Sequence, residues 1–249
     1  MNLTGPMHHI ALEAGSARES DPLQVVRPSF SRRGLHLSAR YLPISKSSEL
    51  RNAKILHIIS SALNVLSREG HARLSMRSVA TEAQLSLSTL QHYFESKEKL
   101  LMETVRVFAY SFMDRYKAFS LQKELTAREA LDHVLQEIID EATHKEIAGI
   151  LIEIWALGVH DQAIGELLTE LYGEYRRLLA KLFMDLDIGL SPKAADDLAS
   201  LLAMQSEGLV MMAFYGGILH PLPESLSYQF KTMWTILARQ MVTDAPIPG

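Results

Sequence analysis

Residues 74–101 of the chain read LSMRSVATEAQLSLSTLQHYFESKEKLL. This stretch predicts two short helices joined by a tight turn. Ser75 can cap the first helix and Ser86 the second, because a serine hydroxyl accepts hydrogen bonds from the free N–H groups of a helix start. Each helix has one apolar face at helical spacing. The apolar residues are Met76, Val79, Ala80 and Ala83 in the first helix and Leu90 and Phe94 in the second.

The outward face of the second helix is polar and aromatic, which is typical of a helix-turn-helix that enters a DNA major groove. Short hydroxyl and amide side chains suit base edges, and flanking cations and hydroxyls suit phosphate oxygens. The residues predicted to bind DNA are Ser75, Arg77, Leu87, Ser88, Thr89, Gln91, His92, Tyr93 and Lys97. On caps and apolar spacing alone, the alternative is a plain helical hairpin inside an all-α core.

The runs SMRSVATEA (75–83), LSLSTLQHYF (85–94) and SKEKLL (96–101) resemble the N-terminal domain of the tetracycline-repressor (TetR) family. The resemblance extends over about residues 49–105 and implies a three-helix DNA-binding domain. Two residues depart from the family pattern. Gln84 stands where glycine is usual, so a non-glycine residue must take up a left-handed conformation in the turn. Gln91 stands where tyrosine is usual, and its amide can pair with adenine instead of contacting a phosphate.

The charge of the chain is divided unevenly. The net charge is −4 for 249 residues, but residues 27–100 hold 12 Lys and Arg against 5 Asp and Glu. Residues 101–249 hold 12 against 21. A basic head on an acidic body would orient the protein toward DNA. The alternative is an ordinary solvated charge pattern.

Residues 1–46 show no sustained helical period and contain four of the nine prolines. We expect a disordered or loosely structured basic arm here, followed by a DNA-binding domain at 47–96 and an all-α domain at 97–249. The arm could track DNA with its arginines, or it could be a passive tail. The chain has no cysteine, no charged leader and no apolar run of about 18 residues, which predicts a cytoplasmic protein outside the membrane.

Residues 97–249 read as successive amphipathic helices, so the predicted fold class is all-α: a helix-turn-helix domain plus a helical ligand-binding and dimerisation bundle. The helix expected from Pro192 to about Tyr215 is apolar on more than one face. In the TetR family the last two helices form a four-helix interface with a second copy, and the resemblance implies a homodimer through residues 191–242. The alternative is that these helices close the core of a monomer.

An effector cavity is expected among the helices of this C-terminal domain. Its predicted lining is Phe108, Phe112, Met113, Tyr116, Trp155 and Met204, with Glu153, His160, Gln205 or Glu207 as polar anchors. An aromatic and methionine stripe is also what plain core looks like. The runs EIWALGVHDQ (153–162) and YGEYRR (172–177) are similar to the C-terminal domain of betaine- and choline-type regulators. The identity of the small-molecule effector stays open.

No phosphate-binding glycine loop, nucleophile elbow or metal-spaced set of ligands occurs, so we predict no enzyme, no cofactor and no metal site. A helical adaptor that binds another protein remains an alternative. The sequence predicts a DNA-binding transcriptional regulator, a repressor that a small molecule releases from a palindromic double-stranded operator.

Overall fold

In the computed structural model, the chain is described at residues 30–31, 34–35, 49–216 and 222–243. Helices account for nearly all of these ranges, which confirms the predicted all-α class. The helices are α1 Glu49–Glu69, α2 Met76–Glu82, α3 Leu87–Tyr93, α4 Lys97–Leu121, α5 Ala127–Thr143, α6 Lys145–His160, α7 Gln162–Met184, α8 Pro192–Gly216 and α9 Glu224–Thr243. Two-residue strands, β1 (Phe30–Ser31) and β2 (Gly34–Leu35), pair antiparallel beside α1. The rest of the predicted basic arm lies outside the described residues.

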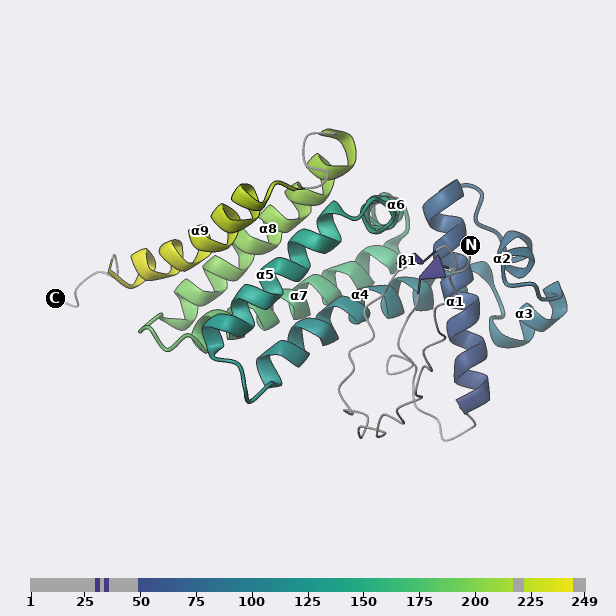
Figure 1. Cartoon of the computed structure of the whole chain (residues 1–249). Helices are drawn as coiled ribbons and strands as arrows, with labels where there is room; N and C mark the ends of the chain where they lie inside the picture. Colours follow the sequence, from purple (N-terminus) through teal and green to yellow (C-terminus); the bar gives the residue numbers. More distant parts are fainter. Residues whose placement is uncertain (1–29, 32–33, 36–48, 217–221, 244–249) are drawn as a thin grey trace, which may run out of the picture.

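Helices α1, α2 and α3 gather at one end of the molecule (Figure 1). The predicted caps are confirmed: Ser75 accepts from the N–H of Ser78, and Ser86 from that of Thr89. Gln84 has a φ of 54°, as the departure from glycine required. The inward residues of the three helices form one continuous apolar core, namely Ile58, Leu63, Leu66, Val79, Ala80, Leu90 and Phe94.

Three polar contacts fasten α2 onto α1. The ring Nε2 of His57 lies 2.9 Å from the carbonyl oxygen of Ala83 at the end of α2. Arg68 forms an ion pair of 2.5 Å with Glu82, and Asn64 donates to the same carboxylate at 3.3 Å. These polar contacts add to the shared apolar core and hold α1 and α2 together as one unit.

The remaining helices form the body, in which α7 packs against α8 and α4, and α5 packs against α8. In Figure 1 the helix α6 is seen nearly end-on between the other helices of the body and α1. Both α4 and α6 contact α1. The helices α4, α5 and α7 each begin at an N-cap whose side chain accepts from backbone N–H groups two or three residues on, namely Ser96, Thr126 and Asp161.

Helix α8 is apolar on opposite sides. Its inner side is buried through Leu198, Leu202 and Val210, whereas Met211 and Met212 on other sides are exposed. Among the described residues it is the one helix long and apolar enough to cross a membrane, a property that the core helix of a soluble protein shares. It packs here against α5, α6, α7 and α9.

Trp234 on α9 corrects one prediction. The interface predicted through residues 191–242 includes Trp234, but its side chain is 2% exposed and packs within the same chain. Its ring lies 6.1 Å from that of Phe183 and 6.5 Å from that of Phe230. Trp234 therefore belongs to the core, because α9 turns its largest side chain toward α7.

Candidate functional site

The outward face of α3 carries most of the predicted DNA-binding residues in accessible positions. Ser88, Gln91 and His92 are exposed, and Leu87, Thr89 and Tyr93 are partly exposed. The Thr89 hydroxyl lies 2.7 Å from the capping hydroxyl of Ser86, so it is already engaged locally. Exposed short polar groups on a short, well-capped helix can meet base edges in a groove.

The predicted phosphate-binding residues flank this face. Arg77 on α2 is exposed, and Lys97 at the first position of α4 is partly exposed. Ser75 is exposed, but its hydroxyl hydrogen-bonds with Ser78 and completes a capping box. Its side chain is therefore committed to holding the start of α2.

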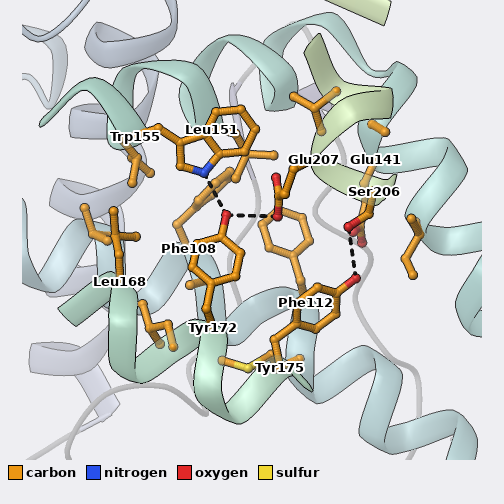
Figure 2. Close-up of a pocket in the computed structure, with 18 of the residues that line it drawn as sticks. Phe108, Phe112, Glu141, Leu151, Trp155, Leu168, Tyr172, Tyr175, Ser206 and Glu207 are labelled. Atoms are coloured by element: carbon orange, nitrogen blue, oxygen red, sulfur yellow. Dashed lines mark hydrogen bonds between the residues drawn. The ribbon is translucent and has the colours of Figure 1, made fainter. Parts of the chain in front are cut away.

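A cavity of about 120 Å³ lies inside the body, walled by α4, α5, α6, α7 and α8 (Figure 2). This volume is of the same order as the roughly 150 Å³ of an engineered apolar cavity that admits benzene. The cavity therefore has a size suited to a small molecule. The lining comprises Val105, Phe108, Ala109, Phe112, Met113, Tyr116, Ile138, Glu141, Ala142, Leu151, Ile154, Trp155, Leu168, Leu171, Tyr172, Tyr175, Ser206, Glu207 and Val210.

Five of the six predicted lining residues meet at this cavity together with the predicted polar anchor Glu207; the five are Phe108, Phe112, Met113, Tyr116 and Trp155. The prediction for Met204 is wrong, because its side chain is 63% exposed and points away from the cavity. Of the proposed polar anchors, His160 and Gln205 are also exposed, and Glu153 contacts the α1–α2 connection. Of the four proposed anchors, only Glu207 lines the cavity.

Four polar lining residues were missed, namely Glu141, Tyr172, Tyr175 and Ser206. A usable signal existed for Glu141. It lies on the apolar face of α5 in register with Ile138 and Val134, and a carboxylate at such a position needs a partner or a ligand. The tyrosines carried no comparable signal, because their spacing is also that of ordinary core.

Glu141 is held by a buried cation. Arg115 on α4 is 4% exposed and binds Glu141 through its guanidinium, with Glu137 3.3 Å from its Nε. The Tyr116 hydroxyl also donates to Glu141. Burial raises the pKa of Glu141 to about 7 against the opposing effects of Arg115 and Tyr116. This carboxyl group thus has its own positive partner within the protein.

Among the described residues, no cation contacts Glu207 in this way. A chain of donors reaches it across the cavity in Figure 2: the Trp155 indole N–H donates to the Tyr172 hydroxyl at 2.8 Å, and that hydroxyl donates to Glu207 at 2.9 Å. Burial raises the pKa of Glu207 to about 7, opposed only by the hydrogen bond from Tyr172. Ionising Glu207 therefore leaves a negative charge facing an aromatic-lined space.

A second candidate surface lies on the other sides of α8 and α9. Large apolar side chains there are accessible to solvent, namely Leu201, Met204, Met211, Met212, Phe214, Tyr215, Leu226, Tyr228, Met233 and Ile236. We call these ten residues the α8/α9 apolar face. A shallow groove on α9 runs along part of it, bordered by Tyr228, Met233 and Ile236. Exposed apolar area of this extent typically marks an interface.

Comparison with known proteins shows which families and relatives this chain is similar to. Residues 58–104 match the model for bacterial regulatory proteins of the tetR family, and residues 127–222 match that for the C-terminal domain of BetI-type transcriptional repressors. An HTH-type transcriptional regulator of Xanthobacter autotrophicus is 28% identical over 195 residues, covering 77% of this chain and 92% of that protein. The regulator BetI of Vibrio vulnificus is 24% identical, covering 61% of this chain and 76% of its own length.

Solved structures share the fold. A transcriptional regulator from Pseudomonas aeruginosa superposes with a TM-score of 0.66 at 20% identity, over 80% of this chain and 95% of its own. A regulator from Saccharomonospora viridis, solved in complex with choline, has a TM-score of 0.58 at 19% identity, over 76% and 95% of the two chains. At these identities the likeness concerns the fold.

Replacing Glu207 with glutamine should stabilise the protein at pH 8 and change little at pH 4. Because burial raises the pKa of Glu207 from 4.5 to about 7, its contribution to stability is complete below pH 4.5 and is lost as pH rises through 7. Glutamine removes that loss, which amounts to up to about 3 kcal/mol above pH 7. Urea unfolding at both pH values measures the difference.

The matched control is Glu166→Gln, a change of the same kind on the exposed side of α7. It should alter the free energy of unfolding equally at both pH values. A gain for Glu207→Gln that does not depend on pH would contradict the assigned titration.

Proposed function

The chain belongs to the tetR family of bacterial regulatory proteins, and we propose that it is a transcriptional repressor released from its DNA operator by a small molecule. One observation carries this proposal. Helix α4 starts at Lys97 beside the DNA-reading helix α3, and its middle turns supply Phe108 and Phe112 to the cavity wall. A molecule in the cavity therefore touches the same helix that begins at the DNA-binding face. We propose the cytoplasm as its compartment, because that is where bacterial operators are.

We further propose that the repressor is a homodimer through the α8/α9 apolar face. A single helix-turn-helix reads only a half-site, and two-fold symmetric dimers read palindromic operators with half-sites about one helical turn apart. A two-fold axis would bring the same face of both copies together, so that each apolar side chain meets a similar surface. The exposed methionines suit this role, since their flexible side chains fill irregular gaps.

The cavity favours a small organic cation. Glu207 supplies a carboxylate that no cation contacts among the described residues, and Trp155 and Tyr172 supply aromatic rings beside it. Aromatic faces attract cations through their quadrupoles, most strongly when water is excluded. The related fold from Saccharomonospora viridis, solved with choline, agrees with this chemistry. A ligand lowers DNA affinity only if it binds one arrangement of the reading heads better than the other.

The DNA-reading assignment predicts two different mutational effects. Ser88→Ala or Gln91→Ala should relax sequence preference, by about 1–3 kcal/mol where a bidentate base contact is lost. Lys97→Ala should weaken binding to all duplexes alike and reduce the salt slope by about one, because it removes a phosphate contact. Selection from a random duplex pool identifies the operator, and salt titrations measure both effects.

The control for this experiment is Lys193→Ala, which removes an exposed cation at the start of α8. It should leave sequence preference and salt slope unchanged. If every α3 variant lost affinity equally for all duplex sequences, the assignment of base contacts would be refuted.

The dimer proposal predicts that Met211→Lys produces monomers that no longer bind the operator. Met211 is 41% exposed on the α8/α9 apolar face, so lysine there costs little within one chain but buries a charge in the interface. A hot-spot loss of at least about 2 kcal/mol on each side raises the dimer Kd at least about a thousandfold, since the change occurs twice. Sedimentation equilibrium measures the Kd.

Val159→Lys provides the comparison, because Val159 is an exposed apolar residue on α6, outside this face. That variant should remain dimeric and bind DNA. Unmodified protein that sediments as a monomer at micromolar concentration would disprove the interface.

The cation proposal predicts that choline binds more tightly than 3,3-dimethylbutan-1-ol, its uncharged isostere, and lowers operator affinity. The choline Kd should be about tenfold lower at pH 8 than at pH 6, because only the ionised form of a group with a pKa of about 7 attracts the cation. Calorimetry at both pH values, with and without operator duplex, measures these quantities.

Glu207→Gln separates this carboxyl group from Glu141, which has Arg115 as its partner. The variant should bind choline more weakly and lose the pH dependence. Equal affinity of wild-type protein for choline and for its uncharged isostere would rule out a cation site.

A further inference from the structure

The connection between α1 and α2 is docked on a carboxylate of the body. The backbone N–H of His71 donates to Oε2 of Glu153 at 2.8 Å, and the His71 ring Nδ1 lies 2.6 Å from the same oxygen. Burial alone would raise the pKa of Glu153, but the hydrogen bonds from His71 hold it below its usual value. The partners lie 82 residues apart in sequence. We call this contact the His71–Glu153 latch.

Gly70 makes the close approach possible. Its φ is +74°, which turns the chain out of α1, and a Cβ placed on it would lie 3.0 Å from Oε1 of Glu153. Glycine alone accepts this backbone conformation without strain and leaves room for the carboxylate. The end of α1 therefore rests directly against the Glu153 side chain.

On the DNA side, the latch acts on α1 and α2, which are held together as one unit. α1 is tied to α2 by His57, Asn64 and Arg68, and the six residues after Glu69 lead straight into α2. A displacement of the α1–α2 connection is thus passed to the whole helix-turn-helix rather than absorbed by one loop.

On the cavity side, Glu153 precedes two wall residues. Ile154 and Trp155 line the cavity, and Trp155 begins the donor chain to Tyr172 and Glu207. Successive residues of a helix point about 100° apart, so neighbouring positions of α6 face the cavity and α1. Any shift or rotation of α6 that accommodates a molecule beside Trp155 must move the Glu153 carboxylate.

We propose that Glu153 is a positioning residue that transmits the state of the cavity to the DNA-binding head through its latch with His71. This inference rests on the proposed function, because it assigns a route by which a cavity occupant changes operator binding. The latch acts beside the continuous helix α4 and gives the head a second point of attachment to the cavity wall.

The test uses a side chain as the cavity occupant, so that it does not depend on the natural ligand. Val210→Phe places a ring in the cavity from α8, and Leu168→Phe does so from α7 should the first variant fail to fold. Operator Kd is measured for the full-length wild type, the filled variant, Glu153→Ala and the double variant. Couplings between sites typically reach at least about fivefold.

We expect filling to weaken operator binding at least fivefold in the wild-type background and less than twofold when Glu153 is alanine. Glu153→Gln, whose amide oxygen can still accept from both His71 groups, should keep most of the response. Non-specific duplex affinity should be unchanged by Glu153→Ala, because the contact lies away from the outward face of α3; this readout separates a transmitting role from general damage to the head.

Glu146→Ala is the matched control. Glu146 is an exposed carboxylate on the same helix, and it pairs with a different histidine, His144, at 3.1 Å. It should leave the full response intact. An equal loss of affinity on filling with and without Glu153, or no loss in any background, would overturn the latch while leaving repression possible. A wild type without sequence-selective duplex binding would instead remove the proposed function and the latch with it.

Discussion

The constraint on which this structure depends is the continuity of α4. Its 25 residues run without a break from Lys97 to Leu121, a rod of roughly 37 Å at about 1.5 Å per residue. The rod begins where the DNA-reading helix ends and carries Phe108, Phe112 and Tyr116 into the cavity. One continuous helix therefore leads from the end of the DNA-binding head to the cavity wall, so a displacement at one end bears on the other.

The cavity adds a second constraint, which is electrostatic. Two carboxyl groups lie on the wall of one mostly apolar cavity, and burying a charge is costly unless it is paired. Arg115 compensates Glu141, but among the described residues nothing positively charged contacts Glu207. The raised pKa of Glu207 lowers this cost, because about half of the groups are protonated near pH 7. The cation that we propose would supply the missing partner and favour the ionised form, which would make binding both charge-selective and pH-dependent.

The sequence predicted what short-range physics determines. The caps Ser75 and Ser86 and the left-handed Gln84 depend on a few neighbouring residues, and all three occur as expected. The two misplaced apolar side chains, Met204 and Trp234, lie on α8 and α9. A helix that is apolar on most sides gives no indication of which side turns inward, so Met204 was placed inside and Trp234 outside. Contacts such as His71 with Glu153 depend on packing between distant elements, and no local pattern encodes them.

That same ambiguity has a physical meaning in α8. Ser206, Glu207 and Val210 face the cavity, whereas Met204, Met211 and Met212 lie on the face that we propose for the dimer. Helix α8 would then line the cavity on one side and form the dimer interface on the other. Such a helix requires apolar residues on nearly all sides. Close-packed layers transmit displacement because they contain few voids to absorb it. An occupant of the cavity therefore bears on α4, α6 and α8 at once, and through them on the reading head, its docking contact and the proposed partner.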